Sequence, residues 1–350
     1  MCNYRVSIVI PCYNNGYLLS KMIDCVLRQT YTDWELIVVD DCSTDNTQNI
    51  VNEYVKTDKR IKLLIRDREP KGAQTCRNIG MNNAVGKFIV IFDADDLISN
   101  TCIEKRVTFM KNNQGVDYAS FPARSFTDEK HLPAFSDKGK KYGVGDDNTD
   151  LLSCLLKADY SVIVWTNIYK KISLTNLQWD EKVKVYQDFD FAVSVVLSDL
   201  KHKFSELQEV DYFYRRIGAG NTTSSNFVSQ EKCDSTIYLF SKTLDKLKLR
   251  SDYTKRRKEF GKFIVLHYER LIIDGKRKKL DEYLSFCKKY YNVLYGKLFF
   301  ISKLTLSIKN LVFRKLLLHL LMSFLFFRKQ SAMVFKSAIK QKIKMIIRKL

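Results

Sequence analysis

The chain has 350 residues, of which 45% are hydrophobic and four are proline. This composition excludes a disordered or low-complexity protein and leaves room for one large domain plus an appendage. The net charge is +20, but residues 241–350 hold 29 of the 59 Lys and Arg residues and 7 of the 39 Asp and Glu residues, so we expect two regions with different roles.

The first 121 residues alternate short apolar runs with amphipathic helical patterns. The first run, residues 6–10, is too short for a secretory signal, has no basic segment before it and is predicted to be a strand. Further strands are predicted over residues 34–40, 61–65, 87–93 and 117–121, and helices over 17–28, 47–55, 73–84 and 101–110. Continuously apolar strands that alternate with amphipathic helices indicate an α/β fold, with a mostly parallel sheet covered on both faces.

The pattern becomes less regular in the following part of the chain. In order, we expect a surface loop over 127–150, an ordered segment over 160–169, a helix over 188–198, a strand over 210–214, a mobile polar loop over 215–226, and helices from about 232 onward. Ligands of a parallel sheet bind beyond the carboxyl ends of its strands, where this sequence places "PCYNN", "DDCSTDN" and "DADD". The functional site is expected at that edge.

Cysteine usage bears on the compartment. The nine cysteines are odd in number and never form a C-x-x-C pair. A disulfide scaffold or a zinc site is therefore not expected, and a reducing cytoplasm fits better.

Three carboxylates, Asp93, Asp95 and Asp96, follow a strongly apolar strand in "FIVIFDADDL". Hard oxygen ligands of this kind suit Mg²⁺ or Mn²⁺ held jointly by protein and phosphates, and one of them can also bind a ribose hydroxyl. The alternative is a surface turn whose aspartates cap the next helix. A phosphatase of the haloacid dehalogenase type also ends a strand in D-x-D, but it continues with Gly-Thr near the N-terminus, whereas here Leu97 follows Asp96 deep in the chain.

A second acidic motif is "VVDDCSTDNT" at residues 38–47, in which Asp40 and Asp41 close a strand. Ser43 can cap the next helix, but capping does not explain two acids on the strand end. A carboxylate there can accept the imide N–H of uracil, and Tyr13 in "PCYNN" can stack on the base.

Taken in order, "VSIVIPCYN", "ELIVVDDCSTDNT", "GAQTCRNIGMNNAVGKFIVIFDADD" and "YQDFDF" resemble the family 2 glycosyltransferases with the GT-A fold, over roughly residues 4–225. The resemblance implies a UDP-sugar donor, a divalent cation (Mn²⁺ or Mg²⁺) and inversion at the anomeric carbon. Carried over by motif, it places the donor nucleotide at Pro11, Tyr13, Asp40, Asp41, Arg77, Asp93 and Asp95, and the metal at Asp95 and Asp96.

The reaction needs a base, because a sugar hydroxyl is a poor nucleophile until a carboxylate takes its proton. The family places this Asp in a Glu-Asp pair that opens a late helix, and here "VYQDFDF" offers Asp188, with Gln187 where Glu is usual. Asp190 is the fallback, and either acid could instead be a helix-start residue favoured by the helix dipole.

Further side chains have weaker assignments. Lys71, Arg215 and Arg216, like Arg77, could stabilise the departing diphosphate, although surface cations are usually solvated. Trp165 lies in the stretch where relatives present an acceptor-side wall, so it could stack on a sugar, although a Trp is as often part of the core.

The basic tail predicts membrane association. In residues 333–350 apolar side chains recur on one helical face and Lys or Arg on another, which indicates a helix lying in an anionic membrane interface. The preceding apolar run, 316–327, is shorter than the roughly 20 residues that a span needs, so we expect it to dip into the interface or pack against the protein. Nucleic acid is not expected, because it explains the charge but not the apolar stripe.

These observations together predict a GT-A catalytic domain over residues 1–235 and a basic, helical, membrane-associating region over 236–350. By the resemblance, the protein transfers a sugar from a UDP-sugar to a saccharide hydroxyl, on a lipid-linked glycan for capsule, exopolysaccharide or O-antigen. It is expected in the cytoplasm, peripheral on the inner face of the cell membrane. Two alternatives stay open: a catalytically inactive membrane-bound partner of another transferase, because of Gln187, and a nucleotidyltransferase, which would show a Gly-rich loop after Ile10.

Overall fold

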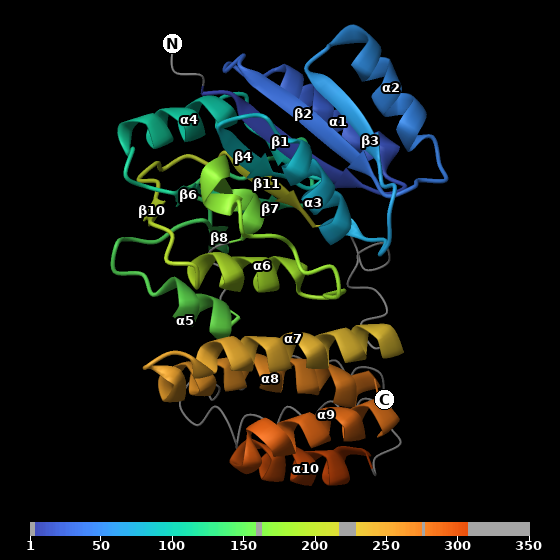
Figure 1. The fold of residues 1–350 in the computed structure, drawn as a ribbon, viewed down its shortest axis with the longest axis vertical. Helices are drawn as coiled ribbons and strands as arrows, with labels where there is room; N and C mark the ends of the chain where they lie inside the picture. The colour runs from blue at the N-terminus through green and yellow to red at the C-terminus, as the bar shows by residue number, and fades with distance from the viewer. Residues whose placement is uncertain (1–3, 159–162, 217–228, 275–276, 307–350) are drawn as a thin grey trace, which may run out of the picture. The chain divides into compact units, whose positions relative to one another are not determined.

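The computed structural model describes residues 4–158, 163–216, 229–274 and 277–306. A seven-stranded sheet lies at the centre of the first part of the chain, in the order β10-β6-β9-β4-β1-β2-β3 (Figure 1). Its strands are β1 (Val6–Cys12), β2 (Trp34–Asp40), β3 (Ile61–Ile65), β4 (Phe88–Ile91), β6 (Tyr118–Ser120), β9 (Asn167–Lys170) and β10 (His202–Phe204).

This sheet is mostly parallel. Only β9 runs against its neighbours, antiparallel to both β4 and β6, and every other adjacent pair is parallel. In the register of β1 with β2, Cys12 lies opposite Asp40, so the polar turns after the two strands meet at one edge. The predicted α/β fold with its mostly parallel sheet is confirmed.

Helices cover both faces of the sheet, and the alternation of side chains along the strands decides which core each residue joins. Ile8 and Ile10 of β1 pack in a core with residues of α1, α2 and α4, whereas Val9 packs in a second core with residues of α3 and α6. The helices are α1 (Gly16–Leu27), α2 (Thr47–Thr57), α3 (Ala73–Asn83), α4 (Cys102–Asn112), α5 (Leu151–Leu156) and α6 (Gln187–Val196), with 3-10 turns η1 (Val164–Thr166) and η2 (Lys171–Leu174).

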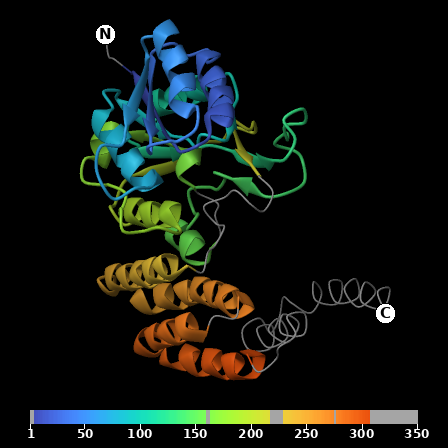
Figure 2. The same ribbon diagram turned by 90° about the vertical axis from the view of Figure 1, so that its right-hand side faces the viewer.

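A second, four-stranded sheet has the order β5-β11-β7-β8. Its strands are β5 (Leu97–Ile98), β7 (Ala123–Phe126), β8 (Lys141–Tyr142) and β11 (Tyr212–Arg215). Figure 2 shows the β7–β8 hairpin in green with β11 in yellow beside it. Because β5 follows the "DADD" turn directly and pairs with β11, the second sheet holds the end of this turn in place.

The amino-terminal edge of the large sheet contains a buried acid, Glu35. Its carboxylate accepts hydrogen bonds from the Ser7 hydroxyl (2.6 Å), the Val85 amide (2.7 Å) and the Lys62 ammonium (2.8 Å). Burial alone would raise the pKa of Glu35, but these three donors hold it below its ordinary value. Gly86 donates to the Ser7 hydroxyl, and a Cβ at Gly86 would lie 2.7 Å from the Ser7 amide nitrogen, so the position requires glycine.

The chain divides into two units, Met1–Glu259 and Phe260–Leu350. The predicted boundary after residue 235 falls inside α7 (Gln230–Lys248), whereas the first unit continues through this helix. Helix α7 belongs to the first unit because it binds the α/β part through polar side chains: Lys242 of α7 pairs with Asp190 of α6 at 2.8 Å.

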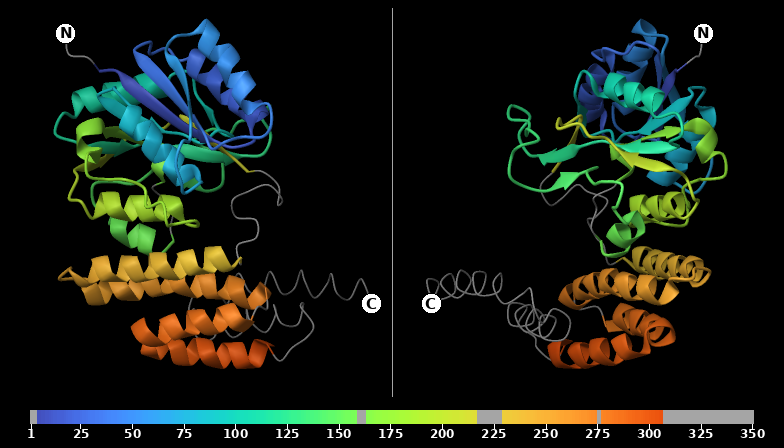
Figure 3. Two further views of the ribbon diagram at one scale, coloured as in Figure 1. Left: turned by 45° about the vertical axis from the view of Figure 1, so that its right-hand side comes forward. Right: turned by 90° about the vertical axis from the view of Figure 1, so that its left-hand side faces the viewer.

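Three helices complete the described chain: α8 (Tyr253–Asp274), which begins in the first unit, α9 (Arg277–Tyr290) and α10 (Asn292–Leu306) (Figure 3). In the second unit the Tyr283 hydroxyl donates to the Ile264 carbonyl at 2.7 Å, which joins α9 to α8. Among the described residues, we find no helix with the length and apolar content that a membrane crossing requires. The predicted interfacial segments, 316–327 and 333–350, lie outside the described residues.

Candidate active site

Asp40 ends β2 and is fully buried. Its carboxylate accepts hydrogen bonds from the Ser43 amide (2.9 Å) and hydroxyl and from the Gln48 side chain (2.7 Å). The Cys12 thiol lies 3.6 Å away. Because protein donors already satisfy this carboxylate, its role in the structure is to hold the turn between β2 and α2.

Asp41 is the next residue and binds the Arg66 guanidinium. The Tyr13 ring follows β1 at the same edge and is 45% exposed, with the Lys71 ammonium 4.8 Å from its centroid. Pro11 is a buried residue of β1, opposite Val39 of β2. Tyr13, which is expected to stack on uracil, therefore has an open ring surface.

The "DADD" turn carries its three carboxylates in three different environments. Asp93 accepts a hydrogen bond from Arg77 at 2.8 Å. Asp95 lies beside it, and burial, followed by the negative charge of Asp93, raises the pKa of the Asp95 carboxyl to about 6. Among the described residues, the Asp95 carboxylate accepts no hydrogen bond from another residue.

Asp96 is completely buried, and its partners lie on β11. Its carboxylate accepts the Tyr212 hydroxyl at 2.5 Å and the Arg215 amide at 2.7 Å, which joins the turn to β11. Burial, with the charges of Asp95 and Asp93, raises the pKa of Asp96 well above its ordinary value. The expectation that Asp96 is a metal ligand does not fit this geometry, because both of its oxygens are engaged by protein donors.

Arg77 of α3 is the buried centre of the site. Its guanidinium binds Asp93 at 2.8 Å, lies 3.6 Å from the Asp188 carboxylate and packs 4.4 Å from the centroid of the Trp179 ring. Within the described residues, its Nε atom is buried without a hydrogen-bond partner. Arg77 therefore connects the end of β4 to the first turn of α6.

Asp188 lies in the first turn of α6, next to Gln187. Partial burial raises the pKa of the Asp188 carboxyl to about 6, the positive charge of Arg77 opposes this shift, and the negative charge of Asp93 adds to it. The side chain is still 39% accessible to water. The Gln187 amide donates to Gln74 at 2.7 Å and accepts from Arg77 at 3.4 Å. The accessible Asp188 carboxylate thus lies beside Arg77, the cation that also binds Asp93.

Asp190 has a different partner. It is buried and pairs with Lys242 at 2.8 Å, and burial raises the pKa of Asp190 even with this cation adjacent. The structure thus brings Asp93 and Asp188 together through Arg77 and leaves Asp190 bound to α7.

Trp165 is 4% exposed, and its ring stacks on Tyr212 (centroids 4.8 Å apart) and Tyr214 (5.5 Å). The expectation that Trp165 stacks on an acceptor sugar is wrong for this structure, because its ring is packed in the core. This packing positions β11, whose Tyr212 hydroxyl binds Asp96 and also accepts the Asp93 amide at 3.2 Å.

One buried ion pair behind the site was not predicted. Arg106 of α4 donates twice to Asp211, at 2.7 and 2.9 Å, and also to the Trp165 carbonyl. A signal was present, because Arg106 lies between Ile103 and Met110 on the apolar face of its helix. No comparable signal marked Tyr212, whose partner Asp96 is far away in the sequence.

For a metal ion, oxygen donors are available from Asp93 and Asp95. Among the residues that the structure describes, no three His, Cys, Asp or Glu side chains gather into a ready-made metal site. Any cation here would need additional ligands from outside the protein.

Comparison with known proteins gives consistent results. A model of the family "Glycosyl transferase family 2" matches residues 7–172. The chain is 42% identical over 122 residues to the UDP-Glc:α-D-GlcNAc-diphosphoundecaprenol β-1,3-glucosyltransferase WfgD of Escherichia coli, a stretch that covers 35% of this chain and 47% of that protein. It is 32% identical over 212 residues to an uncharacterized glycosyltransferase of Methanocaldococcus jannaschii, covering 60% of this chain and 70% of that protein. The match with the Escherichia coli protein thus spans about half of that relative's length.

Among solved structures, S. aureus TarS 1-349 in complex with UDP-GlcNAc is similar, with a TM-score of 0.65 and 17% sequence identity over 90% of each chain. At this identity the likeness concerns the fold.

Proposed function

Because the chain belongs to glycosyl transferase family 2 and has the GT-A fold, we propose that it transfers a sugar from a UDP-sugar to a saccharide hydroxyl, with inversion at the anomeric carbon. One observation carries the proposal: Arg77 binds Asp93, on the expected donor side, and lies 3.6 Å from the accessible Asp188. The buried Arg77 guanidinium therefore holds Asp93 of the "DADD" turn and the candidate catalytic base, Asp188, at a fixed separation.

Asp188 is the proposed catalytic base. A carboxyl with a pKa of about 6 is mostly ionised at neutral pH, yet it is more basic than an ordinary aspartate. Both properties favour removal of a proton from the acceptor hydroxyl while the new bond to carbon forms. Asp190 lacks this position because it is paired with Lys242.

The donor nucleotide is proposed to lie over Tyr13, with its diphosphate toward Arg77, whose buried Nε lacks a partner among the described residues. Asp95, assisted by Asp93, would hold Mn²⁺ or Mg²⁺ together with the diphosphate oxygens, and the ion would neutralise charge on the departing UDP. The Asp95 carboxylate fits this role, because burial and then the negative charge of Asp93 raise its pKa, and no cation forms an ion pair with its oxygens among the described residues. Asp40, through Ser43, and Asp41, through Arg66, would support the turn that binds the uracil ring.

The acceptor is proposed to be a lipid-linked saccharide of a bacterial surface glycan, used at the inner face of the cell membrane. Two facts support this: the Escherichia coli relative is named for a diphosphoundecaprenol-linked substrate, and the last third of this chain is strongly basic. Binding to anionic vesicles should weaken as salt rises, because the attraction is screened over about 10 Å at 0.1 M. Binding that does not depend on salt would contradict an electrostatic membrane contact.

The proposed activity is tested by measuring UDP release from a panel of UDP-sugars, with Mn²⁺ and with EDTA, in the presence of saccharide acceptors. We expect release from at least one donor, dependent on the metal. Absence of release with every donor, in a protein that still binds UDP, would instead favour a catalytically inactive partner of another transferase.

A further inference from the structure

The segment from Asp180 to Asp190 carries Asp188 and enters α6 through Tyr186, whose φ is 57°. This segment has little backbone pairing of its own, so side chains from neighbouring helices determine its position. On the donor side, α3 holds it: Gln74 accepts a hydrogen bond from Gln187 at 2.7 Å.

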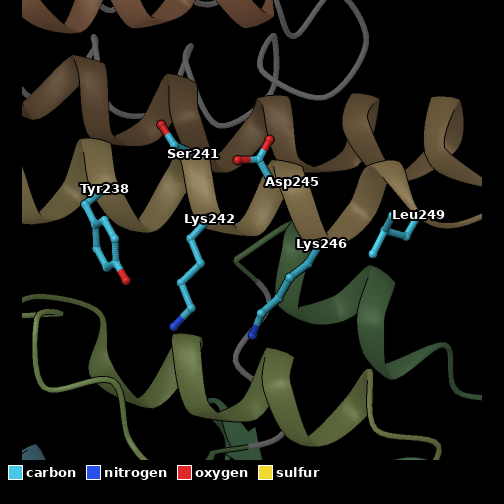
Figure 4. A pocket seen from close by; sticks show the side chains of 6 residues that line it. All are labelled: Tyr238, Ser241, Lys242, Asp245, Lys246 and Leu249. Atoms are coloured by element: carbon cyan, nitrogen blue, oxygen red, sulfur yellow. The ribbon is translucent and has the colours of Figure 1, made fainter.

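The opposite side of the same segment is held by α7. Its Ser235 hydroxyl accepts the Lys184 amide at 2.7 Å, and its Tyr238 hydroxyl donates to Asp180 at 2.8 Å. Lys242 follows one turn later. Spacings of three and four residues place these side chains on one face of the helix, and Figure 4 shows Tyr238 and Lys242 pointing from α7 toward α6.

Lys242 makes the two contacts that enclose the candidate base. Its ammonium lies 2.7 Å from Asp180 and 2.8 Å from Asp190, so one cation binds both ends of the segment. Asp190 is two residues after Asp188 in the first turn of α6, and Asp180 begins the loop that leads to it. Fixing these two points restricts the direction in which the Asp188 carboxylate can point.

We propose that Lys242 is a positioning residue for Asp188, and hence that α7 is part of the catalytic apparatus; this inference rests on the proposed function. Lys242 touches neither substrate nor reacting atoms. It acts by holding the Asp180–Asp190 segment against α3, so that Asp188 stays beside Arg77. A buried ion pair with only a structural role would instead affect folding and leave the geometry of the base unchanged.

The matched control is Lys246, one turn further along α7. It also points toward α6 in Figure 4, and its ammonium donates to the Ser194 hydroxyl at 2.9 Å, near the end of that helix. It therefore shares residue type, helix and neighbour with Lys242. Among the described residues, however, its ammonium forms no hydrogen bond or ion pair with the Asp180–Asp190 segment and acts on Asp190 and Asp180 only through longer-range charge.

The experiment compares Lys242→Met, Lys242→Arg and Lys246→Met with the unaltered full chain, using a UDP-sugar that the unaltered protein consumes. Lys242→Met should lower kcat about 10- to 100-fold, since a displacement near 1 Å can cost 10²-fold. Its KM for the donor and its affinity for UDP should change by no more than about twofold. Lys242→Arg, which can still reach both carboxylates, should recover most of kcat, and Lys246→Met should keep it within about twofold.

A second readout does not need activity. Hydrogen exchange of backbone amides in residues 180–190 should be faster in Lys242→Met than in Lys246→Met. If no donor is consumed by the unaltered protein, the proposed function fails, while exchange still tests the positioning. Unchanged exchange, or an unchanged kcat in Lys242→Met, would overturn the inference.

Lys242→Met leaves Asp180 and Asp190 without their shared cation, and this loss can lower the fraction of protein that folds. In that case Tyr238→Phe, which removes only the hydroxyl bound to Asp180, provides the same test. It should lower kcat by about two- to fivefold with UDP affinity unchanged. An equal loss of kcat and UDP affinity in both variants would indicate general destabilisation and contradict a positioning role.

Discussion

The two ends of the seven-stranded sheet differ in how their carboxylates are paired. At the amino end, Glu35 receives three hydrogen bonds and its pKa is held below the ordinary value. At the carboxyl end, Asp95 and Asp188 have pKa values raised to about 6, and the Nε atom of Arg77 has no partner among the described residues. Buried polar groups are normally satisfied, so the incomplete pairing at one end indicates where a ligand is expected.

The same comparison separates residues within the carboxyl end. Asp40 and Asp96 are as completely bonded as Glu35, through Ser43 and Gln48 in one case and Tyr212 in the other. We therefore propose that Asp40 and Asp96 form the framework of the site and that Asp95 and Asp188 take part in the chemistry.

Removing Arg77 should have the largest effect. Arg77→Met would leave Asp93 and Asp188 without their shared cation and remove a donor to the diphosphate, so kcat/KM should fall by about 10³-fold or more. UDP affinity, measured by calorimetry, should fall with it. Normal UDP affinity in Arg77→Met would mean that the unpaired Nε does not mark the donor site.

Asp95 tests the proposed cation. UDP should bind more tightly with Mn²⁺ or Mg²⁺ than with EDTA, and Asp95→Ala should remove that difference because the bridging ligand is lost. We expect about a 10²-fold loss of transfer, within the range for removing one electrostatic contact. Asp96→Asn is the comparison variant; loss of metal dependence there but not in Asp95→Ala would reverse the assignment.

At the amino end, Glu35→Ala should reduce stability and leave the chemistry intact. The buried Ser7 hydroxyl and Val85 amide would lose their acceptor, which costs about 1–3 kcal/mol. Chemical denaturation should detect this loss, while the kcat of the remaining folded protein should be unchanged. A fall in kcat without a fall in stability would remove the distinction between the two ends.

The pH dependence of transfer should show a smaller effect. The base must be ionised, and the Asp188 carboxyl has a pKa raised to about 6. At pH 6, kcat/KM should therefore be about half of its plateau at higher pH, and it should fall about tenfold per unit below pH 5. A rate that rises as the pH is lowered through this range would contradict a base with this pKa.

The sequence predicted the parts of the fold that depend on local pattern. The bounds of β2 and β3 agree with the predicted strands over 34–40 and 61–65, because apolar runs of this length with polar ends define a buried strand. The strand β8 was not predicted, since two residues inside a polar stretch carry no periodicity.

The candidate site was predicted in part, for reasons that depend on distance along the chain. The motifs located Asp93, Asp95 and Asp188, but they did not indicate that Asp96 turns toward Tyr212, which is 116 residues away. The burial of Trp165 likewise follows from Tyr212 and Tyr214 on β11, and tertiary packing of this kind leaves no local signature.

The most direct measurement of the central claim is transfer by Asp188→Asn beside its affinity for UDP. The amide keeps the size of the side chain but cannot accept the proton, so transfer should fall by about 10²- to 10⁴-fold while UDP affinity stays near that of the unaltered protein. Normal transfer by Asp188→Asn, together with loss of transfer in Asp190→Asn, would contradict the account and identify the carboxylate bound to Lys242 as the base.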